Sequence, residues 1–240
     1  ILIDTQNLRR IADQFASRET GHFVVATTHT QARYALPTII KWFKADYPKV
    51  HLALHQGSPK EIADMLTSGA ADVGIATEGL DESPEIATFP FYRWHHAVIV
   101  RKDHPLLRAG AVTLEALSEY PIITYHEGFT GRAHVDKAFA DAGIVPDIVL
   151  SAIDADVIKT YVDLDLGVGI IASMAYDADK DRNLSLIPVP ELFPSNTTRL
   201  AVRRGTYLRS YAYAFIEKVC PDVGEEAVRA ALSKQNGSDS

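Results

Sequence analysis

The sequence has few of the features that define several large classes of proteins. Its single cysteine, Cys220, cannot form an intramolecular disulfide, which favours a reducing compartment. No window approaches the ~18 to 20 consecutive apolar residues of a membrane span, and the N-terminus lacks the basic-then-apolar pattern of a signal peptide. Lys and Arg total 24 against 31 Asp and Glu, and no basic run is dense enough to track a phosphate backbone. We therefore expect a cytoplasmic chain that by itself binds neither membranes nor nucleic acid.

Motifs of catalysis and of metal binding are missing as well. There is no Gly-x-Ser-x-Gly elbow, no phosphate loop, and no Gly-x-Gly-x-x-Gly in register with a predicted strand. Asp154 and Asp156 fall in the first turn of a predicted helix, where acidic residues favour the helix dipole. His51 and His55 share a strand face but lie too far apart to bind one ion. We expect neither an enzyme nor a metal site.

The sequence does contain two series of short apolar strands that alternate with amphipathic helices. This alternation is typical of mostly parallel sheets with helices on both faces. It predicts an α/β protein with two Rossmann-like units and a cleft between them. The predicted strands are 22–27, 50–56, 71–77, 93–101, 122–125, 147–152, 168–173, 184–188 and 198–203; the predicted helices are 31–48, 58–69, 113–121, 130–143, 154–167, 207–219 and 222–234.

Two further segments have more than one interpretation. Residues 2–15 have apolar side chains at helical spacing and precede a polar turn, so we interpret them as the end of a helix that begins upstream. The predicted helix 31–48 contains two adjacent large aromatic residues, Trp42 and Phe43. This is more aromatic side chain than the buried face of one helix usually carries. They fit either core packing or a contact between subunits.

Hydroxyl and amide groups gather where strands give way to helices or turns. A helix N-terminus offers unpaired N–H groups and a positive dipole end, which attract an anion or a small polar ligand. Thr and Ser are also ordinary helix caps, so capping alone explains any one group. Their coincidence at strand ends, where open α/β sheets bind ligands, favours a binding site. The residues are Thr27, Thr28, Thr30 and Gln31, then Gln56, Gly57 and Ser58, then Thr77, and finally Gly128, Phe129, Thr130 and Gly131.

Several longer motifs resemble one family. These are TTHTQARYALP, HQGSP, IADMLTSGAADVGIATEGL, PIITY, GFTGR, DADVIKTYV and LGVGIIASMA. They are similar to the effector-binding domain of the CysB/Cbl group of LysR-type transcriptional regulators, over about residues 18–218. The resemblance implies a type 2 periplasmic-binding-protein fold, with two subdomains joined by two crossover strands. It also implies that the DNA-binding domain is missing from this chain, with 1–17 as the end of a linker helix, 18–92 and 195–240 as subdomain I, and 93–194 as subdomain II.

The same resemblance implies a sensor of sulfur assimilation and cysteine biosynthesis that acts as a transcription activator. In this group the cleft binds sulfate or an acetylserine (O-acetylserine or N-acetylserine), and some members respond to adenosine phosphosulfate. No other cofactor is implied. The matching effector-binding positions are Thr28, Thr30, Gln31, Thr77 and Thr130, and a wider set comprises Thr27, Gln56, Gly128, Phe129 and Arg132. Hydroxyl and amide donors can bind an anion without a buried counter-charge.

The expected partners are the effector, a second copy of the chain, and DNA through the missing domain alone. We expect a head-to-tail homodimer formed by the 31–48 helix of one subunit and the 154–166 helix of the other, and a tetramer at full length. Three residues depart from the family pattern: His126 and Glu127 beside the site, and Asp165 where a glycine is usual. A carboxylate at 127 would repel a second anion. The alternative function is a solute-binding protein of a transport system with the same fold; an enzyme on that fold ranks third, because no nucleophile and base can be paired.

Overall fold

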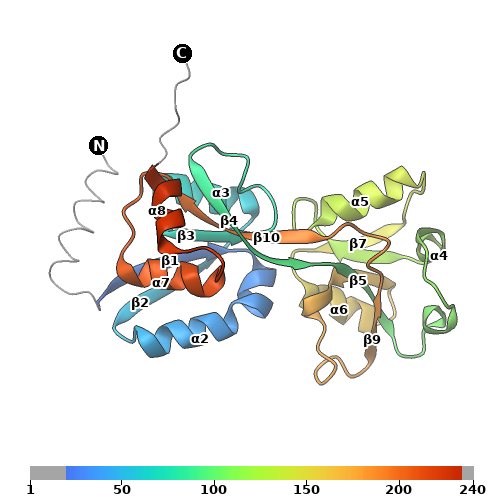
Figure 1. Ribbon diagram of the computed structural model, residues 1–240. Coiled ribbons are helices and arrows are strands. Elements are labelled where there is room, and N and C mark those ends of the chain that lie inside the picture. The colour runs from blue at the N-terminus through green and yellow to red at the C-terminus, as the bar shows by residue number, and fades with distance from the viewer. Residues whose placement is uncertain (1–19, 234–240) are drawn as a thin grey trace, which may run out of the picture. The chain divides into compact units, whose positions relative to one another are not determined.

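The computed structural model describes residues 20–233 (Figure 1). The chain divides into two compact units, and each unit contains one five-stranded sheet. Within the described residues, unit 1 comprises those up to Tyr92 and those from Thr198 onward, whereas unit 2 is the intervening segment Arg93–Thr197. The chain therefore passes from one unit to the other twice. No helix within residues 20–233 is both long enough and apolar enough to cross a membrane.

Unit 1 is built on a sheet with the strand order β2-β1-β3-β10-β4. The three strands that come first in the chain are parallel, while β10 runs antiparallel to β3. The strands are β1 (Gly21–Thr27), β2 (Val50–Gln56), β3 (Val73–Ala76), β4 (Ile86–Trp94) and β10 (Asn196–Arg203). The helices are α2 (Pro37–Asp46), α3 (Pro59–Ser68), α7 (Ser210–Val219) and α8 (Glu225–Ser233), and a π-helical turn, η1, spans Gln31–Ala35.

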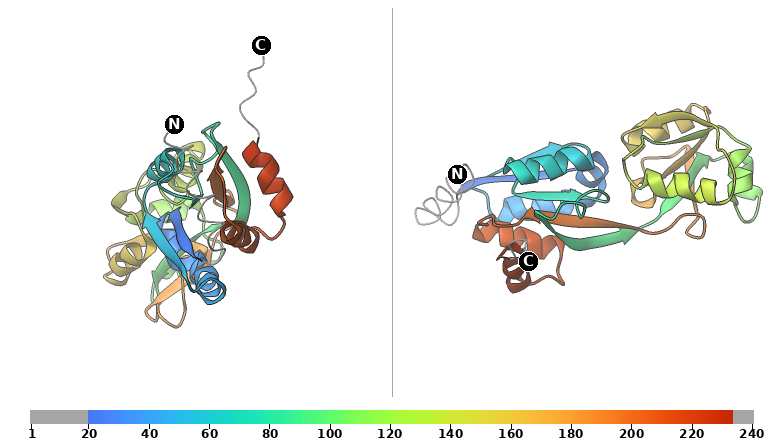
Figure 2. Two further views of the ribbon diagram at one scale, coloured as in Figure 1. Left: turned by 90° about the vertical axis from the view of Figure 1, so that its left-hand side faces the viewer. Right: turned by 90° about the horizontal axis from the view of Figure 1, so that it is seen from above.

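Helices cover both faces of the unit 1 sheet. On one face, Phe43 of α2 and Phe215 of α7 pack around Phe23 of β1, in a cluster that extends to α8. On the other face, Ile62 and Leu66 of α3 pack on the sheet (Figure 2, right). Helix α3 approaches so closely that a Cβ atom added at Gly74 would lie 2.8 Å from both side chains. Glycine in β3 therefore sets how deeply α3 can pack.

Unit 2 has the strand order β7-β6-β8-β5-β9. Its β6 is parallel to β7 and β8, whereas β5 is antiparallel to β8 and β9. A cluster around Phe139 and Phe193 fills one face, and α6 packs over Gly169 of β8 on the other. The strands are β5 (His96–Arg101), β6 (Ile122–Tyr125), β7 (Ile148–Ala152), β8 (Val168–Ala172) and β9 (Leu184–Pro188); the helices are α4 (Leu114–Ser118), α5 (Arg132–Asp141), α6 (Ala155–Asp163) and the short 3-10 turns η2 (Pro105–Arg108) and η3 (Ser173–Ala175).

The predicted parallel pairing is confirmed within each strand-helix-strand series, and each sheet also contains antiparallel pairs. Parallel pairing follows from strand-helix-strand crossovers, and these exist only within each alternating series. Strand β10 reaches sheet 1 from unit 2, so no such crossover fixes its direction, and it enters antiparallel to β3. The prediction of helices on both faces is confirmed for unit 1.

The predicted helix 31–48 is two elements rather than one. The N–H of Leu36 donates to the carbonyl of Gln31, five residues back, which closes the π turn η1, and α2 then starts at Pro37. Leu36 itself is helical, with φ −86° and ψ −19°, but proline has no N–H to donate, so the regular hydrogen-bond pattern of a helix is interrupted at Pro37. The predicted strand 93–101 is also interrupted, since β4 ends at Trp94 and β5 begins at His96. Phe43 is buried in the core and Trp42 is partly buried against it.

Candidate functional site

The carboxyl ends of β1, β2 and β3 meet at one edge of the unit 1 sheet. In the parallel register Thr27 stands opposite Gln56 of β2 and Ile75 of β3. The chain then leaves β1 through Thr28 and Thr30 into the η1 turn, and Thr27, Thr28, Thr30 and Gln31 are all buried. The structure thus brings the first three predicted polar groups to one sheet edge. A π turn at this point is typical of functional sites in helices.

A chain of hydrogen bonds connects Gln31 with Thr77 through two residues that sequence reasoning missed. The Tyr92 hydroxyl donates to Gln31 Oε1 over 2.5 Å, and it is also bonded to Thr198. The Thr198 and Thr77 hydroxyl oxygens lie 3.2 Å apart. Burial raises the pKa of Tyr92 to about 12, so its hydroxyl remains protonated and remains a donor. Both residues lie on strands at the opposite side of the sheet from β2, far away in sequence from the TTHTQ motif.

The side-chain amide of Gln31 has one occupied and one vacant hydrogen-bonding group. Its oxygen accepts from Tyr92, which fixes the orientation of the amide plane. Its Nε2 atom is buried and has no hydrogen-bond partner among the described residues. A buried donor without an acceptor raises the free energy of the folded state by about 1–3 kcal/mol. The geometry therefore presents a donor to any acceptor that can enter.

Other residues of the wider predicted set in unit 1 already have protein partners. The Thr27 hydroxyl donates to the carbonyl of Ile75 over 3.0 Å. The exposed Gln56 side chain is within 3.0 Å of His29 Nδ1 through its Oε1 atom. At the next helix, Ser58 forms a capping box with Glu61, which confirms the predicted start of α3. Each of these three side chains therefore already has a partner within unit 1.

The remaining predicted residues lie in unit 2, in the turn before α5. Thr130 is buried and has a left-handed backbone with φ +47°, which is uncommon for a residue other than glycine, asparagine or aspartate. Gly131 follows at φ +70° and is the N-cap of α5. Gly128 is exposed and Phe129 half-buried, and the departures His126 and Glu127 are exposed as well.

Arg132 is the only cation in the predicted set, and its charge is used inside unit 2. Its Nε donates to Asp136 Oδ1 over 2.7 Å, and another guanidinium nitrogen donates to the carbonyl of Tyr125. Arg132 is buried, whereas the Asp136 side chain is partly exposed. We conclude that Arg132 fixes the first turn of α5 on the end of β6.

Two acidic residues and the cysteine have structural explanations. Asp154 Oδ1 accepts from the N–H of Val157, as expected for the N-cap of α6. Asp165 adopts φ +62° just after α6, the conformation for which the family pattern has glycine. Cys220 is buried at the end of α7, and burial raises the pKa of its thiol to about 12, so the thiolate does not form near neutral pH.

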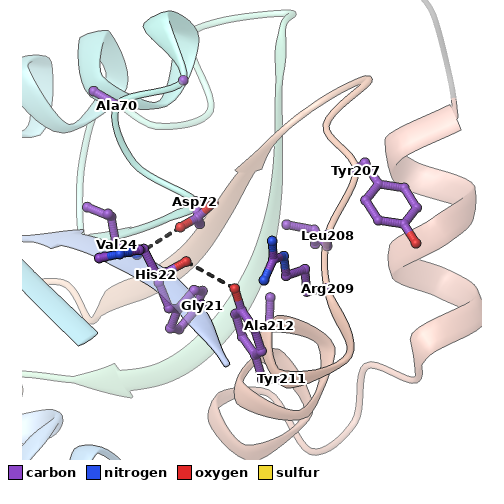
Figure 3. A pocket seen from close by; sticks show the side chains of 12 residues that line it. Gly21, His22, Val24, Ala70, Asp72, Tyr207, Leu208, Arg209, Tyr211 and Ala212 are labelled. Carbon is purple, nitrogen blue, oxygen red and sulfur yellow. Dashed lines mark hydrogen bonds between the residues drawn. The ribbon is translucent and has the colours of Figure 1, made fainter. Parts of the chain in front are cut away.

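A separate pocket of unit 1 opens at the beginning of β1, not at its end (Figure 3). It has a volume of about 210 Å³ and lies among Gly21, Asp72, Arg209 and Tyr211. Its polar groups are engaged with each other, as the dashed lines of Figure 3 show: Asp72 accepts from the N–H of Val24, and the Tyr211 hydroxyl donates to the carbonyl of His22. Arg209 donates to the carbonyl of Thr20. The bonds of Arg209 and Tyr211 hold the start of β1 on α7, and the bond of Asp72 holds β1 on the turn before β3.

Comparisons with known proteins agree on one family. The family model described as the LysR substrate binding domain matches residues 16–219. The HTH-type transcriptional regulator SsuR of Burkholderia cenocepacia is 56% identical over 97% of this chain and 75% of its own length. The regulator CysB of the same species is 49% identical over 97% of this chain and 74% of its own length. The crystal structure of the cofactor-binding domain of the Cbl transcriptional regulator superposes with a TM-score of 0.87 at 44% identity, covering 90% of this chain and 95% of that one.

Proposed function

Given that the chain belongs to the LysR family of effector-binding domains, we propose that it senses a small sulfur metabolite for a transcription regulator of sulfur assimilation and cysteine biosynthesis. The ligands implied by the family resemblance are sulfate, O-acetylserine or N-acetylserine, and adenosine phosphosulfate. All of them carry oxygen acceptors that hydroxyl and amide groups can bind. The named relatives are transcriptional regulators, which favours this function over a solute-binding protein of a transport system.

The observation that carries the proposal is the amide of Gln31. Its orientation is fixed by Tyr92, and its Nε2 donor is buried without a hydrogen-bond partner within residues 20–233. A ligand oxygen at this position would accept from Nε2 and remove the penalty of the unsatisfied donor. Thr28, Thr30 and Thr77 lie at the same sheet edge or in the same hydrogen-bond chain and would add hydroxyl donors. Thr130 of unit 2 is the fifth residue that the family resemblance assigns to the effector.

The proposed effectors can be tested by calorimetry and thermal shift. Sulfate, thiosulfate, O-acetylserine, N-acetylserine and adenosine phosphosulfate would be compared on the wild-type chain. A ligand present at 100 times its dissociation constant stabilises the folded state by about 2.7 kcal/mol, which a thermal shift detects. The variant Gln31→Glu keeps the size of the side chain but replaces the Nε2 donor by a carboxylate oxygen. We expect it to weaken binding of any anion in the panel at least 100-fold, because a donor becomes a negatively charged acceptor.

A matched pair of threonine variants provides the control. Thr28→Val should weaken binding about tenfold, since one neutral hydrogen bond is worth about 1 kcal/mol or somewhat more. Thr27→Val removes a hydroxyl that already donates to Ile75, so it should lower stability and leave affinity within twofold of the wild type. The proposal is wrong if no member of the panel binds, or if Gln31→Glu binds as tightly as the wild type.

We also propose that two copies of the chain associate through α6 of one subunit and the η1–α2 segment of the other. Strand β7 is an edge strand, and several large apolar side chains on β7 and α6, between them and just after α6 are exposed. These are Val149, Ile153, Val157 and Leu164, with exposures of 51%, 52%, 39% and 62%. An apolar patch beside an open strand edge is typical of a subunit interface. Ile153→Asp should give a monomer in analytical ultracentrifugation, whereas Leu107→Asp, which replaces an exposed leucine elsewhere in unit 2, should remain a dimer.

A further inference from the structure

Unit 2 contains a buried polar pair, His96 and Asn196, that none of the predicted roles explains. His96 begins β5 and Asn196 begins β10, and each is 1% exposed. His96 Nε2 lies 3.0 Å from the carbonyl oxygen of Thr130, and Asn196 Nδ2 lies 3.3 Å from His96 Nδ1. Trp94 and Phe193 pack edge-on against the imidazole ring. The pair is therefore held rigidly and is connected directly to a predicted effector residue.

The partners of the imidazole fix its protonation state. A carbonyl oxygen can only accept, so Nε2 must carry the proton that it donates to Thr130. Nδ1 then has a free lone pair, which accepts from the Asn196 amide. The ring is thus neutral, with its proton on Nε2. Burial also lowers the pKa of His96, to about 4, which agrees with a neutral ring.

The same pair limits the space around the turn that contains Thr130. A Cβ atom added at Gly131 would lie 2.3 Å from Asn196 Oδ1 and 2.7 Å from His96 Cε1. Both Thr130 and Gly131 have left-handed backbones, at φ +47° and +70°. Such a conformation in a threonine is unfavourable and persists where surrounding contacts impose it. The hydrogen bond from His96 to the Thr130 carbonyl is a contact of that kind.

We infer that His96 and Asn196 are positioning residues that hold the Thr130–Gly131 turn in the geometry in which Thr130 meets the effector. This inference rests on the proposed function, and in particular on Thr130 as an effector ligand. Neither residue needs to touch the effector. His96 acts on the backbone of Thr130, and Asn196 acts on His96 by fixing its tautomer and its ring orientation.

The test is calorimetric titration with inorganic sulfate, repeated with O-acetylserine, on a set of single and double variants. His96→Phe keeps a ring of similar size and removes both hydrogen bonds; we expect affinity to fall at least tenfold. His96→Gln places an amide N–H near the position of Nε2, so it should recover most of that loss. His95→Phe is the matched control: it changes the adjacent exposed histidine and should leave affinity within twofold. Because His96 acts through Thr130, the double variant His96→Phe/Thr130→Val should bind no more than about twofold more weakly than Thr130→Val.

The outcomes separate this inference from the proposed function. If Thr28→Val weakens binding while His96→Phe binds like the wild type, the positioning role is wrong and the proposed function stands. The role is equally wrong if the losses from His96→Phe and Thr130→Val multiply in the double variant. If neither ligand binds the wild-type chain, or if Thr28→Val has no effect, the proposed function fails and the inference fails with it.

A second variant and a spectroscopic measurement cover the case in which His96→Phe does not fold. Asn196→Ala leaves the ring in place but removes the donor to Nδ1, and it should weaken sulfate or O-acetylserine binding about fivefold. Nitrogen NMR of the wild-type chain at neutral pH should show His96 protonated on Nε2 alone. A proton on Nδ1, or an Asn196→Ala variant with unchanged affinity, would overturn the inference.

Discussion

The substitution Gly131→Ala tests the packing of the Thr130 turn directly. The new methyl group would lie 2.3 Å from Asn196 Oδ1, far inside van der Waals contact, so Asn196 must move and lose its hydrogen bond to His96. Leaving such buried polar groups unsatisfied destabilises a protein by about 1–3 kcal/mol. The left-handed backbone adds about 1–2 kcal/mol for any residue with a Cβ atom. We therefore expect Gly131→Ala to lower the free energy of unfolding in urea by roughly 2–5 kcal/mol.

Gly143→Ala provides the control for the backbone term. Gly143 has φ +71°, nearly the same as Gly131, but apart from Gly143 and its two chain neighbours no residue in 20–233 has an atom within 4 Å of the position of its added Cβ. It should lose only the ~1–2 kcal/mol of the left-handed conformation. In the double variant Gly131→Ala/Asn196→Ala the close contact is relieved. Its loss of unfolding free energy should therefore be smaller than the sum of the losses in the two single variants. The reasoning is refuted if Gly131→Ala destabilises the chain no more than Gly143→Ala does.

Three further substitutions have definite expected outcomes. Burial lowers the pKa of His96 from 6.5 to about 4, so between these pH values the unfolded chain binds more protons than the folded chain. The free energy of unfolding should therefore fall by roughly 3 kcal/mol as the pH drops from 6.5 to 4. Urea denaturation at several pH values should show this fall in the wild type and a flatter profile in His96→Phe. Lys159→Ala should lower the free energy of unfolding by about 3 kcal/mol, because the buried carboxylate of Asp181, which lies 3.1 Å from Lys159 Nζ, would lose its cation. Adding Asp181→Asn to this variant should restore part of the lost stability. Gly74→Ala should lower the thermal midpoint, since α3 must shift away from β3.

The elements predicted correctly are those that depend on residues close together in the sequence, such as helix caps and strand-helix-strand order. Helix α3 lies where the sequence predicts a helix over 58–69, and its caps are the capping box at Ser58 and the left-handed Gly69. Helix α6 likewise begins where the sequence predicts a helix over 154–167, with Asp154 as its N-cap. The predicted strand ends did bring Thr27, Gln56 and the end of β3 to one sheet edge, because parallel register follows from strand-helix-strand order.

The parts that sequence analysis missed depend on long-range pairing. Tyr92 and Thr198 become neighbours of Gln31 and Thr77 only once β4 and β10 join the sheet, more than 60 residues away along the chain from Gln31. The antiparallel direction of β10 has no local signal, since the strand arrives from unit 2. The π turn did have a signal, Pro37, which helical periodicity outweighed.

The missed residues occupy the two segments where the chain passes between the units. At the first passage, Tyr92 ends unit 1 and bonds Gln31, while His96, four residues later in unit 2, bonds the Thr130 carbonyl. At the second passage, Asn196 bonds His96, and Thr198 bonds Thr77, with only Thr197 between them. A ligand can shift a conformational equilibrium only by its differential contacts with the two states. Gln31 and Thr130 are each hydrogen-bonded directly to a residue of a passage segment, Tyr92 or His96. Hinges typically consist of a few residues at the ends of elements, as the passage segments do. The hydrogen bonds that orient Gln31 and Thr130, which we propose to bind the effector, thus also link these residues to the two segments where the chain passes between the units. A response to the effector would have to begin in the backbone of these segments.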